Sequence, residues 1–274
     1  MSASAAVAGA QPGGTDAAKR IEAAVDRTTQ ERSANVQMTI VIDADGESAR
    51  VTAGGAIDFD GDRGVLLMDF SGAPPFQEGA KIEYRFIGGV MYADLAAFGD
   101  AANELPEGKH WVRINSRDLR NNLGISGHGS QQKATSELES LRGVSKEVED
   151  LGIEDVHGFP ATHYKATMDP KKAIKRLPRK ARDKAAKNLL QQLGDRPLPL
   201  EVWIDGRGRA VRTQLESNLA NRPKATAAGE TGTVRRETVE YFEFGAPFFV
   251  YAPQKAETVD FADVVGRLNR GSVV

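Results

Sequence analysis

The sequence has no cysteine and no long apolar run. With no cysteine among its 274 residues, disulfides, thiolate metal sites and cysteine nucleophiles are excluded. No run of apolar residues approaches the roughly 20 that a transmembrane helix needs. The charge is almost balanced, with 36 basic and 38 acidic residues and a net charge of −2, so nothing indicates nucleic-acid binding. A hydrophobic content of 40% is enough for a core.

Histidine is scarce, and the patterns of common active sites are missing. No two of the four histidines have the spacing of a helical zinc site, and there is no Gly-x-Ser-x-Gly motif. Asp58, Asp60 and Asp62 favour a hairpin turn over a calcium loop, because Arg63 stands where such a loop needs glycine. We therefore predict no metal, no cofactor and no catalytic residue, and a protein that is not an enzyme. A hydrolase using surface carboxylates would need acids that converge in a cleft. The histidines are His110, His128, His157 and His163.

The stretch Leu198–Phe244 has the clearest pattern in the chain. Apolar and polar residues alternate on both sides of the turn Asp205-Gly206, which is the signature of a β-hairpin. The alternation of the third run, Thr231–Phe244, changes phase near Tyr241-Phe242, which predicts a bulge or a strong bend there. One side of these strands is apolar, and the other carries charged side chains. The pattern predicts an antiparallel sheet with one solvated face.

The same alternation recurs through the chain. A helix over Asp16–Arg32 is followed by strands joined by Asp-Gly and Gly-Gly turns, with helices inserted between strand groups. No strand–helix–strand pattern of the parallel kind is present. We predict an α+β fold: a single large curved antiparallel β-sheet, a half-barrel, with helices covering its concave apolar face. Residues 1–14 are expected to be a disordered tether and residues 15–270 a single domain.

The apolar side of the predicted sheet is rich in methionine and aromatic residues, while the predicted helices are poor in large apolar ones. A curved sheet under such helices would leave an apolar space suited to acyl chains. The alternative is that these residues simply form the core. The candidate lining residues are Val36, Met38, Ile40, Leu66, Met68, Phe70, Tyr84, Phe86, Met91, Trp111, Leu119, Leu123, Leu138 and Leu141.

The segment Asp169–Leu193 is rich in lysine and arginine and predicts a pair of helices interrupted by Pro178. Such a charged helix face is commonly just solvated. The functional interpretation is contact with anionic lipid headgroups, to which each charge near the surface contributes about 1 kcal/mol. The candidate headgroup contacts are Lys172, Lys175, Arg176, Arg179 and Lys180.

Four segments together resemble the actinobacterial lipoproteins of the LppX/LprG type, which are related in fold to LolA, LolB and the amino-terminal domain of RseB. They are the helix Asp16–Arg32 with the strand after it, the strand around Lys109–Ile114, the hairpin beginning at Leu200, and the terminal stretch from Phe242 to Pro253. The resemblance implies an apolar cavity that holds acyl chains of lipids or glycolipids. It also implies an extracytoplasmic protein, anchored by lipid at the outer face of the cytoplasmic membrane, although the anchor cysteine is not in this sequence.

These observations lead to the hypothesis of a non-enzymatic envelope lipoprotein that carries or presents acylated molecules. Its expected partners are a lipid or glycolipid and the membrane surface. The alternative is a regulatory envelope lipoprotein that senses stress or binds a protein partner with the same fold. The sequence does not distinguish a carrier from a sensor.

Overall fold

The computed structural model describes residues 14–59, 63–73, 76, 78–97, 105–115, 138–176, 190, 193–218 and 233–271. The described strands are β1 Ser33–Ala44, β2 Glu47–Asp58, β3 Arg63–Gly72, β4 Lys81–Ile87, β5 Val90–Asp94, β6 Trp111–Asn115, β7 Glu149–Val156, β8 Phe159–Met168, β9 Leu198–Asp205, β10 Ala210–Asn218, β11 Val234–Phe242 and β12 Thr258–Asp260. The described helices are α1 Gly14–Thr29, η1 Leu141–Gly143, α5 Pro170–Arg176, η3 Lys255–Glu257 and α7 Phe261–Gly271.

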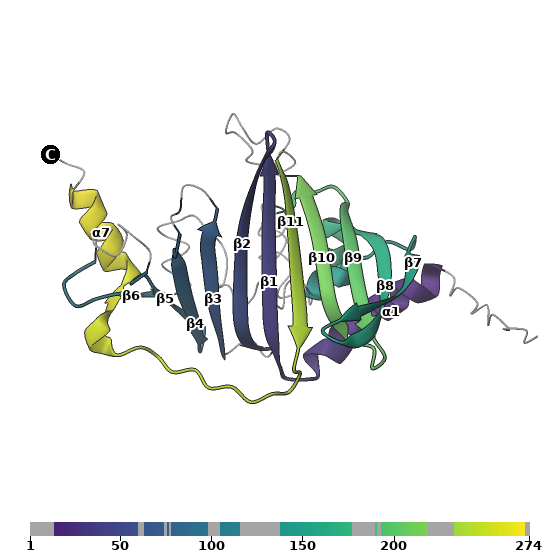
Figure 1. Ribbon diagram of the computed structural model, residues 1–274, viewed down its shortest axis with the longest axis horizontal. Coiled ribbons are helices and arrows are strands. Elements are labelled where there is room, and N and C mark those ends of the chain that lie inside the picture. Colours follow the sequence, from purple (N-terminus) through teal and green to yellow (C-terminus); the bar gives the residue numbers. More distant parts are fainter. Residues whose placement is uncertain are drawn as a thin grey trace, which may run out of the picture.

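All twelve strands belong to one open sheet, in the order β12-β6-β5-β4-β3-β2-β1-β11-β10-β9-β8-β7 (Figure 1). Neighbouring strands are antiparallel except β12 and β6, which are parallel. The prediction of one large sheet is therefore confirmed, but the sheet is mixed rather than wholly antiparallel. β12 has only three residues, too few for a period-two pattern to reveal it.

The middle of the sheet joins segments that are far apart in the sequence. β1 pairs with β2 through the turn at Asp45 and Gly46, both of which have positive φ. On its other side β1 pairs with β11, from Asn35 opposite Phe242 to Asp43 opposite Val234. An early and a late strand of the chain thus pair in the centre of the sheet, and β2–β6 extend to one side while β10–β7 extend to the other.

Helix α1 packs on the half of the sheet formed by β9 and β10. Its buried residues Ile21 and Val25 belong to the main hydrophobic core, which also contains Leu141 of η1 and Leu200 of β9. Thr28 links the helix to the sheet: its hydroxyl donates to the Ala24 carbonyl at 2.7 Å and accepts the Ala210 amide hydrogen at 2.9 Å. Among the described helices, α1 and η1 therefore fix the filled half of the molecule.

The third run of the Leu198–Phe244 stretch has a bend next to the predicted position, at Glu243, but no bulge. β11 pairs with β1 without a register shift and ends at Phe242, and Glu243 follows with a positive φ. The register shift occurs in β10, between Ala210 and Arg212. It turns Val211 to the outer face, where it packs with Trp203.

The carboxyl-terminal segment crosses the lower ends of the central strands to reach the far edge of the sheet (Figure 1). It is fastened at its start by the Ser33 hydroxyl, which donates to the Ala246 carbonyl at 3.0 Å. Farther along, Arg85 donates to the Tyr251 carbonyl at 3.1 Å. β12 then pairs with β6, and α7 contacts both strands.

Several predicted elements lie outside the described residues. These include the helix Ser116–Leu123, the loop Gly124–Gly129 and most of the helix Ser130–Leu141, of which residues 138–140 are helical. Of the predicted pair Asp169–Leu193, α5 forms the first part. The boundaries of the predicted tether and domain stay predictions.

Candidate functional site

The strand register defines one apolar face, here called the inner face. Val36, Leu66 and Tyr84 lie in one row across β1, β3 and β4, with Gly55 of β2 between the first two. Met38 and Met68 lie in the next row. In β4 and β5, Phe86 lies opposite Met91. The inner face is therefore continuous from β11 to β5.

The structure brings most of the predicted lining residues together on this face. Buried in one cluster are Val36, Met38, Leu66, Phe86, Leu138 and Leu141, and partly buried against it are Ile40, Met68, Tyr84 and Met91. Phe70, near the end of β3, contacts Phe76 with ring centroids 5.3 Å apart. Leu119 and Leu123 lie outside the described residues.

Trp111 lies on the other face. It is opposite Asp94 in β5, which is opposite Glu83 in β4, so it alternates with the inner-face residue Val112. The Arg85 guanidinium covers its ring at 4.4 Å from the centroid, a cation–π contact. The prediction that Trp111 shares a face with Met91 was wrong. Because Trp111 and Val112 are both apolar, the alternation alone does not show which of the two faces inward.

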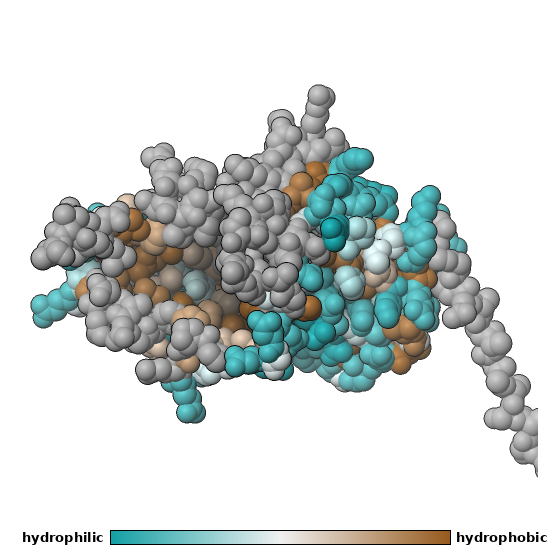
Figure 2. All heavy atoms as spheres, turned by 90° about the horizontal axis from the view of Figure 1, so that it is seen from above, coloured by the Kyte–Doolittle hydropathy of each residue, from teal (hydrophilic) through white to brown (hydrophobic). Residues whose placement is uncertain are grey.

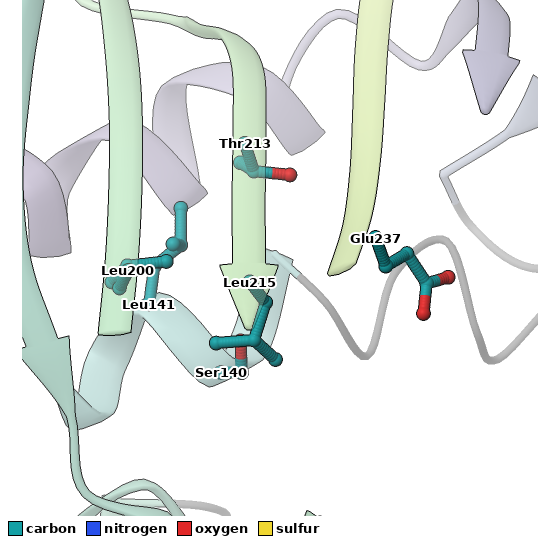
Figure 3. Close-up of a pocket in the computed structure, with 6 residues that line it drawn as sticks. All are labelled: Ser140, Leu141, Leu200, Thr213, Leu215 and Glu237. Atoms are coloured by element: carbon teal, nitrogen blue, oxygen red, sulfur yellow. The ribbon is translucent and has the colours of Figure 1, made fainter. Parts of the chain in front are cut away.

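The half of the inner face beneath α1 and η1 is closely packed. Its enclosed cavity has a volume of about 10 Å³ and is lined by Ser140, Leu141, Leu200, Thr213, Leu215 and Glu237 (Figure 3). A cavity of this size holds at most about one water molecule. This pocket is too small for an acyl chain.

The other half of the inner face is less completely filled by described residues. Figure 2 shows an apolar hollow at the end of the molecule that carries β3–β6. Met68, Tyr84 and Met91 lie on this half and are only partly buried. The Tyr84 and Phe86 rings stack with centroids 6.4 Å apart, and burial raises the pKa of the Tyr84 phenol. Among the described residues, Met68, Met91 and Phe86 make this half of the inner face apolar, and Tyr84 adds a phenol hydroxyl.

A charged pair interrupts the inner face on β11. Arg235 and Glu237 form an ion pair, and both side chains are largely buried. Glu237 lies opposite Ile40 of β1 and Leu215 of β10, at the border between the packed half and the hollow. The alternation along β11 did not reveal this pair, because a buried charge breaks the pattern from which a face is predicted.

The outer face has a groove of about 570 Å³, open to solvent, over β1, β2 and β3. Gly54 lies on its floor, and a Cβ added there would contact nothing within 4 Å. Phe242 and Val65 also line it, and of the predicted lining residues only Val36 does. This groove is not the predicted acyl space, which lies on the opposite face.

A hydrogen-bonded cluster of His163, Glu154, Glu201 and Trp203 lies on the outer face, and the sequence did not predict it. His163 is buried, with Nδ1 2.9 Å from Glu154 Oε1 and Nε2 2.9 Å from Glu201 Oε2. Trp203 donates from Nε1 to Glu154 Oε2 at 2.8 Å. Hydrogen bonds from Trp203 and His163 lower the pKa of Glu154. The residues come from three strands, and no local spacing connects them. The sequence favours solvated or strand-surface histidines, and His163 does lie on a strand at the outer face, but its side chain is buried rather than solvated.

The described basic residues of α5 are partly occupied by contacts within the protein. Arg176 forms an ion pair with Glu22 of α1, and Lys172 lies 3.8 Å from the same carboxylate. Lys172 also donates to the Val144 carbonyl, while Lys175 is exposed. Arg179 and Lys180 lie outside the described residues. Headgroup contact by these five residues stays a prediction.

Two further features, a metal site and a membrane-spanning helix, are absent from the described residues. No group of three or more His, Asp or Glu side chains there is placed to hold a metal ion. None of the described helices is long and apolar enough to cross a membrane. The arrangement defines the chain as an α+β protein built on one large open mixed sheet with an extended apolar face.

The comparisons with known proteins connect this fold to actinobacterial lipoproteins. The chain is 24% identical over 260 residues to "Putative lipoprotein SCO4650" of Streptomyces coelicolor, covering 91% of this chain and 76% of that protein. It is 30% identical over 194 residues to an uncharacterized 31.2 kDa protein of Streptomyces griseus. That match covers 68% of this chain and 58% of the relative, so it spans less than two thirds of the relative's length.

Among solved structures, the lipoprotein LppX of Mycobacterium tuberculosis aligns with 85% of this chain and 99% of its own, at 14% identity and a TM-score of 0.49. No protein-family profile matches the chain. The predicted resemblance to actinobacterial lipoproteins is confirmed by the sequence similarity to the Streptomyces coelicolor relative.

Proposed function

We propose that this protein is a non-enzymatic envelope lipoprotein that binds lipids or glycolipids by their acyl chains. The single observation that supports it most is the contrast between the two halves of the inner face. Beneath α1 and η1 the pocket beside Leu141 and Leu200 has a volume of only about 10 Å³. Over β3–β5 the same face presents Met68, Tyr84 and Met91, all partly buried, and an apolar hollow lies at this end of the molecule (Figure 2).

The mechanism is partition of acyl chains from water into this hollow. Each CH₂ group that is buried contributes about 0.8 kcal/mol. The flexible thioethers of Met68 and Met91 adapt to chains of different shape. In this proposal the sheet is a half-barrel whose concave side is closed by the chain's helices, and the ligand lies between them.

The location is part of the same proposal. The protein acts outside the cytoplasmic membrane, attached through an amino-terminal lipid anchor. The Streptomyces coelicolor relative, which is named "Putative lipoprotein SCO4650", supports the proposal. The exposed Lys175 and its basic neighbours would then lie near anionic headgroups, each contributing about 1 kcal/mol.

The experiment is native mass spectrometry of the protein purified from bacterial cells without detergent. We expect adducts whose masses correspond to acylated lipids, and saturable uptake of a fluorescent fatty acid by the delipidated protein. Absence of both the adducts and the probe uptake would contradict the proposal.

A second candidate is a regulatory protein that binds a protein partner with the same fold. It is favoured by the large exposed apolar residues of the β7–β8 hairpin. A protein that never takes up lipid but binds a partner at this hairpin would fit that candidate instead.

A further inference from the structure

The two edge strands of the sheet, β12 and β7, differ in length and in the elements that contact them. At one edge β12 is short, and α7 packs against it. At the other edge β7 is eight residues long, and the described part of the chain pairs it with β8 alone. An edge strand presents unpaired N–H and C=O groups, and proteins usually shorten or cover such edges. Among the described residues, one edge is contacted by a helix and the longer edge pairs with no further strand.

The open edge also carries large apolar side chains. Leu151 and Ile153 of β7 are 44% and 75% exposed, and Phe159 at the start of β8 is 68% exposed. Ile153 lies opposite Thr162 of β8. Exposed apolar residues that gather on one element mark an interaction surface more often than isolated ones do.

Side-chain contacts hold β7 in place. Glu154 is bonded to Trp203 and His163 on the outer face. Val156 is buried against Trp203 in a small apolar cluster. In the turn that follows, His157 lies 3.3 Å from Glu240 of β11, with its ring 4.5 Å from that of Phe242. The edge is thus pre-organised, which lowers the entropic cost of pairing.

The acidic residues around β7 favour a positively charged partner strand. Acids flank Leu151 and Ile153, and among the described residues of the hairpin the exposed lysines are fewer. The exposed acids are Glu147, Glu149, Glu154 and Asp155, with Asp150 half-buried, and the exposed lysines are Lys146 and Lys165. Two copies joined edge to edge through β7 would bring these acids together, and like charges across paired strands are destabilising. A strand with lysine or arginine among apolar residues would instead be attracted.

We infer that β7 is the docking edge for an extended, positively charged segment of a partner protein, which adds to the sheet as a further strand. This mode joins main-chain hydrogen bonds to side-chain selection. The regular part of the edge follows Gly152, whose positive φ and register shift interrupt the strand. Pairing is therefore expected along residues 152–156, with an apolar side chain beside Ile153 and a cation near Asp155. The inference does not depend on acyl binding in the hollow.

The test uses the full chain labelled with ¹⁵N and a short synthetic peptide in which valine alternates with lysine. We expect saturable shifts of the backbone amide signals centred on residues 151–156. The same peptide with glutamate in place of lysine, or with N-methylated backbone amides, is expected not to bind. Equal binding of either modified peptide would overturn the inference, as would the absence of shifts with the original one.

Two variants localise the effect. Ile153→Lys places a positive charge on the edge that repels the lysines of the peptide, and it is expected to weaken peptide binding by about tenfold or more. Leu67→Lys is the matched control, an exposed apolar strand residue in β3, and is expected to bind the peptide as the unchanged protein does. If sedimentation shows a dimer that Ile153→Lys dissolves, the edge serves a second copy of the chain and the inference is wrong. Thermal unfolding and uptake of the fatty-acid probe should be unchanged in Ile153→Lys, which separates this test from that of lipid binding.

Discussion

The imidazole of His163 and the indole of Trp203 are nearly parallel on the outer face, with ring centroids 4.0 Å apart and planes at 13°. Glu154 of β7 contacts both rings, and Glu201 of β9 contacts the second imidazole nitrogen. Three strands are thereby joined by side chains as well as by their backbones. These hydrogen bonds connect the edge strand β7 to β8 and β9.

Replacing Glu154 by glutamine should make stability less sensitive to acid. The pKa of Glu154 is lowered below its ordinary 4.5 by hydrogen bonds from Trp203 and His163. A lowered pKa means that the carboxylate adds stability above pH 4.5, and that this is lost as the pH falls through the lower folded-state value. We expect Glu154→Gln to melt below the unchanged protein at pH 7 and to converge with it in acid. Parallel melting curves across the whole pH range would contradict this.

The hydroxyl of Thr28 is expected to matter much more than that of Thr29. Thr28→Val leaves the Ala210 N–H without its acceptor in the core, which should cost about 1–3 kcal/mol of unfolding free energy. Thr29 bonds only to carbonyls of its own helix, so Thr29→Val should change stability by less than about 0.5 kcal/mol. Urea unfolding of both variants and of Thr28→Ser, which keeps the hydroxyl, measures the difference.

Two adjacent glycines of β2 should respond in opposite ways to alanine. At Gly55 an added Cβ would lie 1.9 Å from the Val65 carbonyl oxygen, whereas at Gly54 it would meet nothing within 4 Å. Gly55→Ala is expected to destabilise by about 3 kcal/mol or more. Gly54→Ala should be neutral or stabilise by up to about 1 kcal/mol, because glycine weakens a strand. Similar melting temperatures for the two variants would show that β2 and β3 can separate at this point.

Met68 and Leu67 provide a paired test of the proposed acyl site. They are neighbours on β3 that point to opposite faces: Met68 packs at the inner cluster, and Leu67 is exposed on the outer face. Met68→Asp places a charge in the hollow and should abolish fatty-acid uptake, because burying an unpaired carboxylate is costly. Leu67→Asp should leave uptake unchanged. Loss of uptake in both variants would point to general unfolding, which circular dichroism would reveal.

Short-range features were predictable because local patterns determine them. The sequence predicts strands over Lys81–Ile87 and Val90–Asp94, which are the bounds of β4 and β5. It also predicts a turn near His157-Gly158, where the structure has one. The inner-face residues of β1, β3 and β4 also follow from alternation, since a strand's side chains switch faces with every residue.

Long-range features were not predictable. The pairing of Met38 with Val239 joins segments about 200 residues apart, and alternation does not specify partners. Trp111 shows the related difficulty: its neighbour Val112 is equally apolar, and only the register with Asp94 fixes the face. The cluster around His163 depends on Glu154 and Glu201 coming together from different strands, so no motif marks it.

The position of β11 between β1 and β10 has a consequence for biosynthesis. Until residues 234–242 leave the ribosome, β1–β6 and β7–β10 have no strand to join them, and each group ends in a bare edge that can recruit other chains. Such distant closure is intrinsically slow. Nascent or truncated forms that stop before β11 should therefore need chaperone protection, and premature stops between residues 206 and 233 should be tolerated poorly.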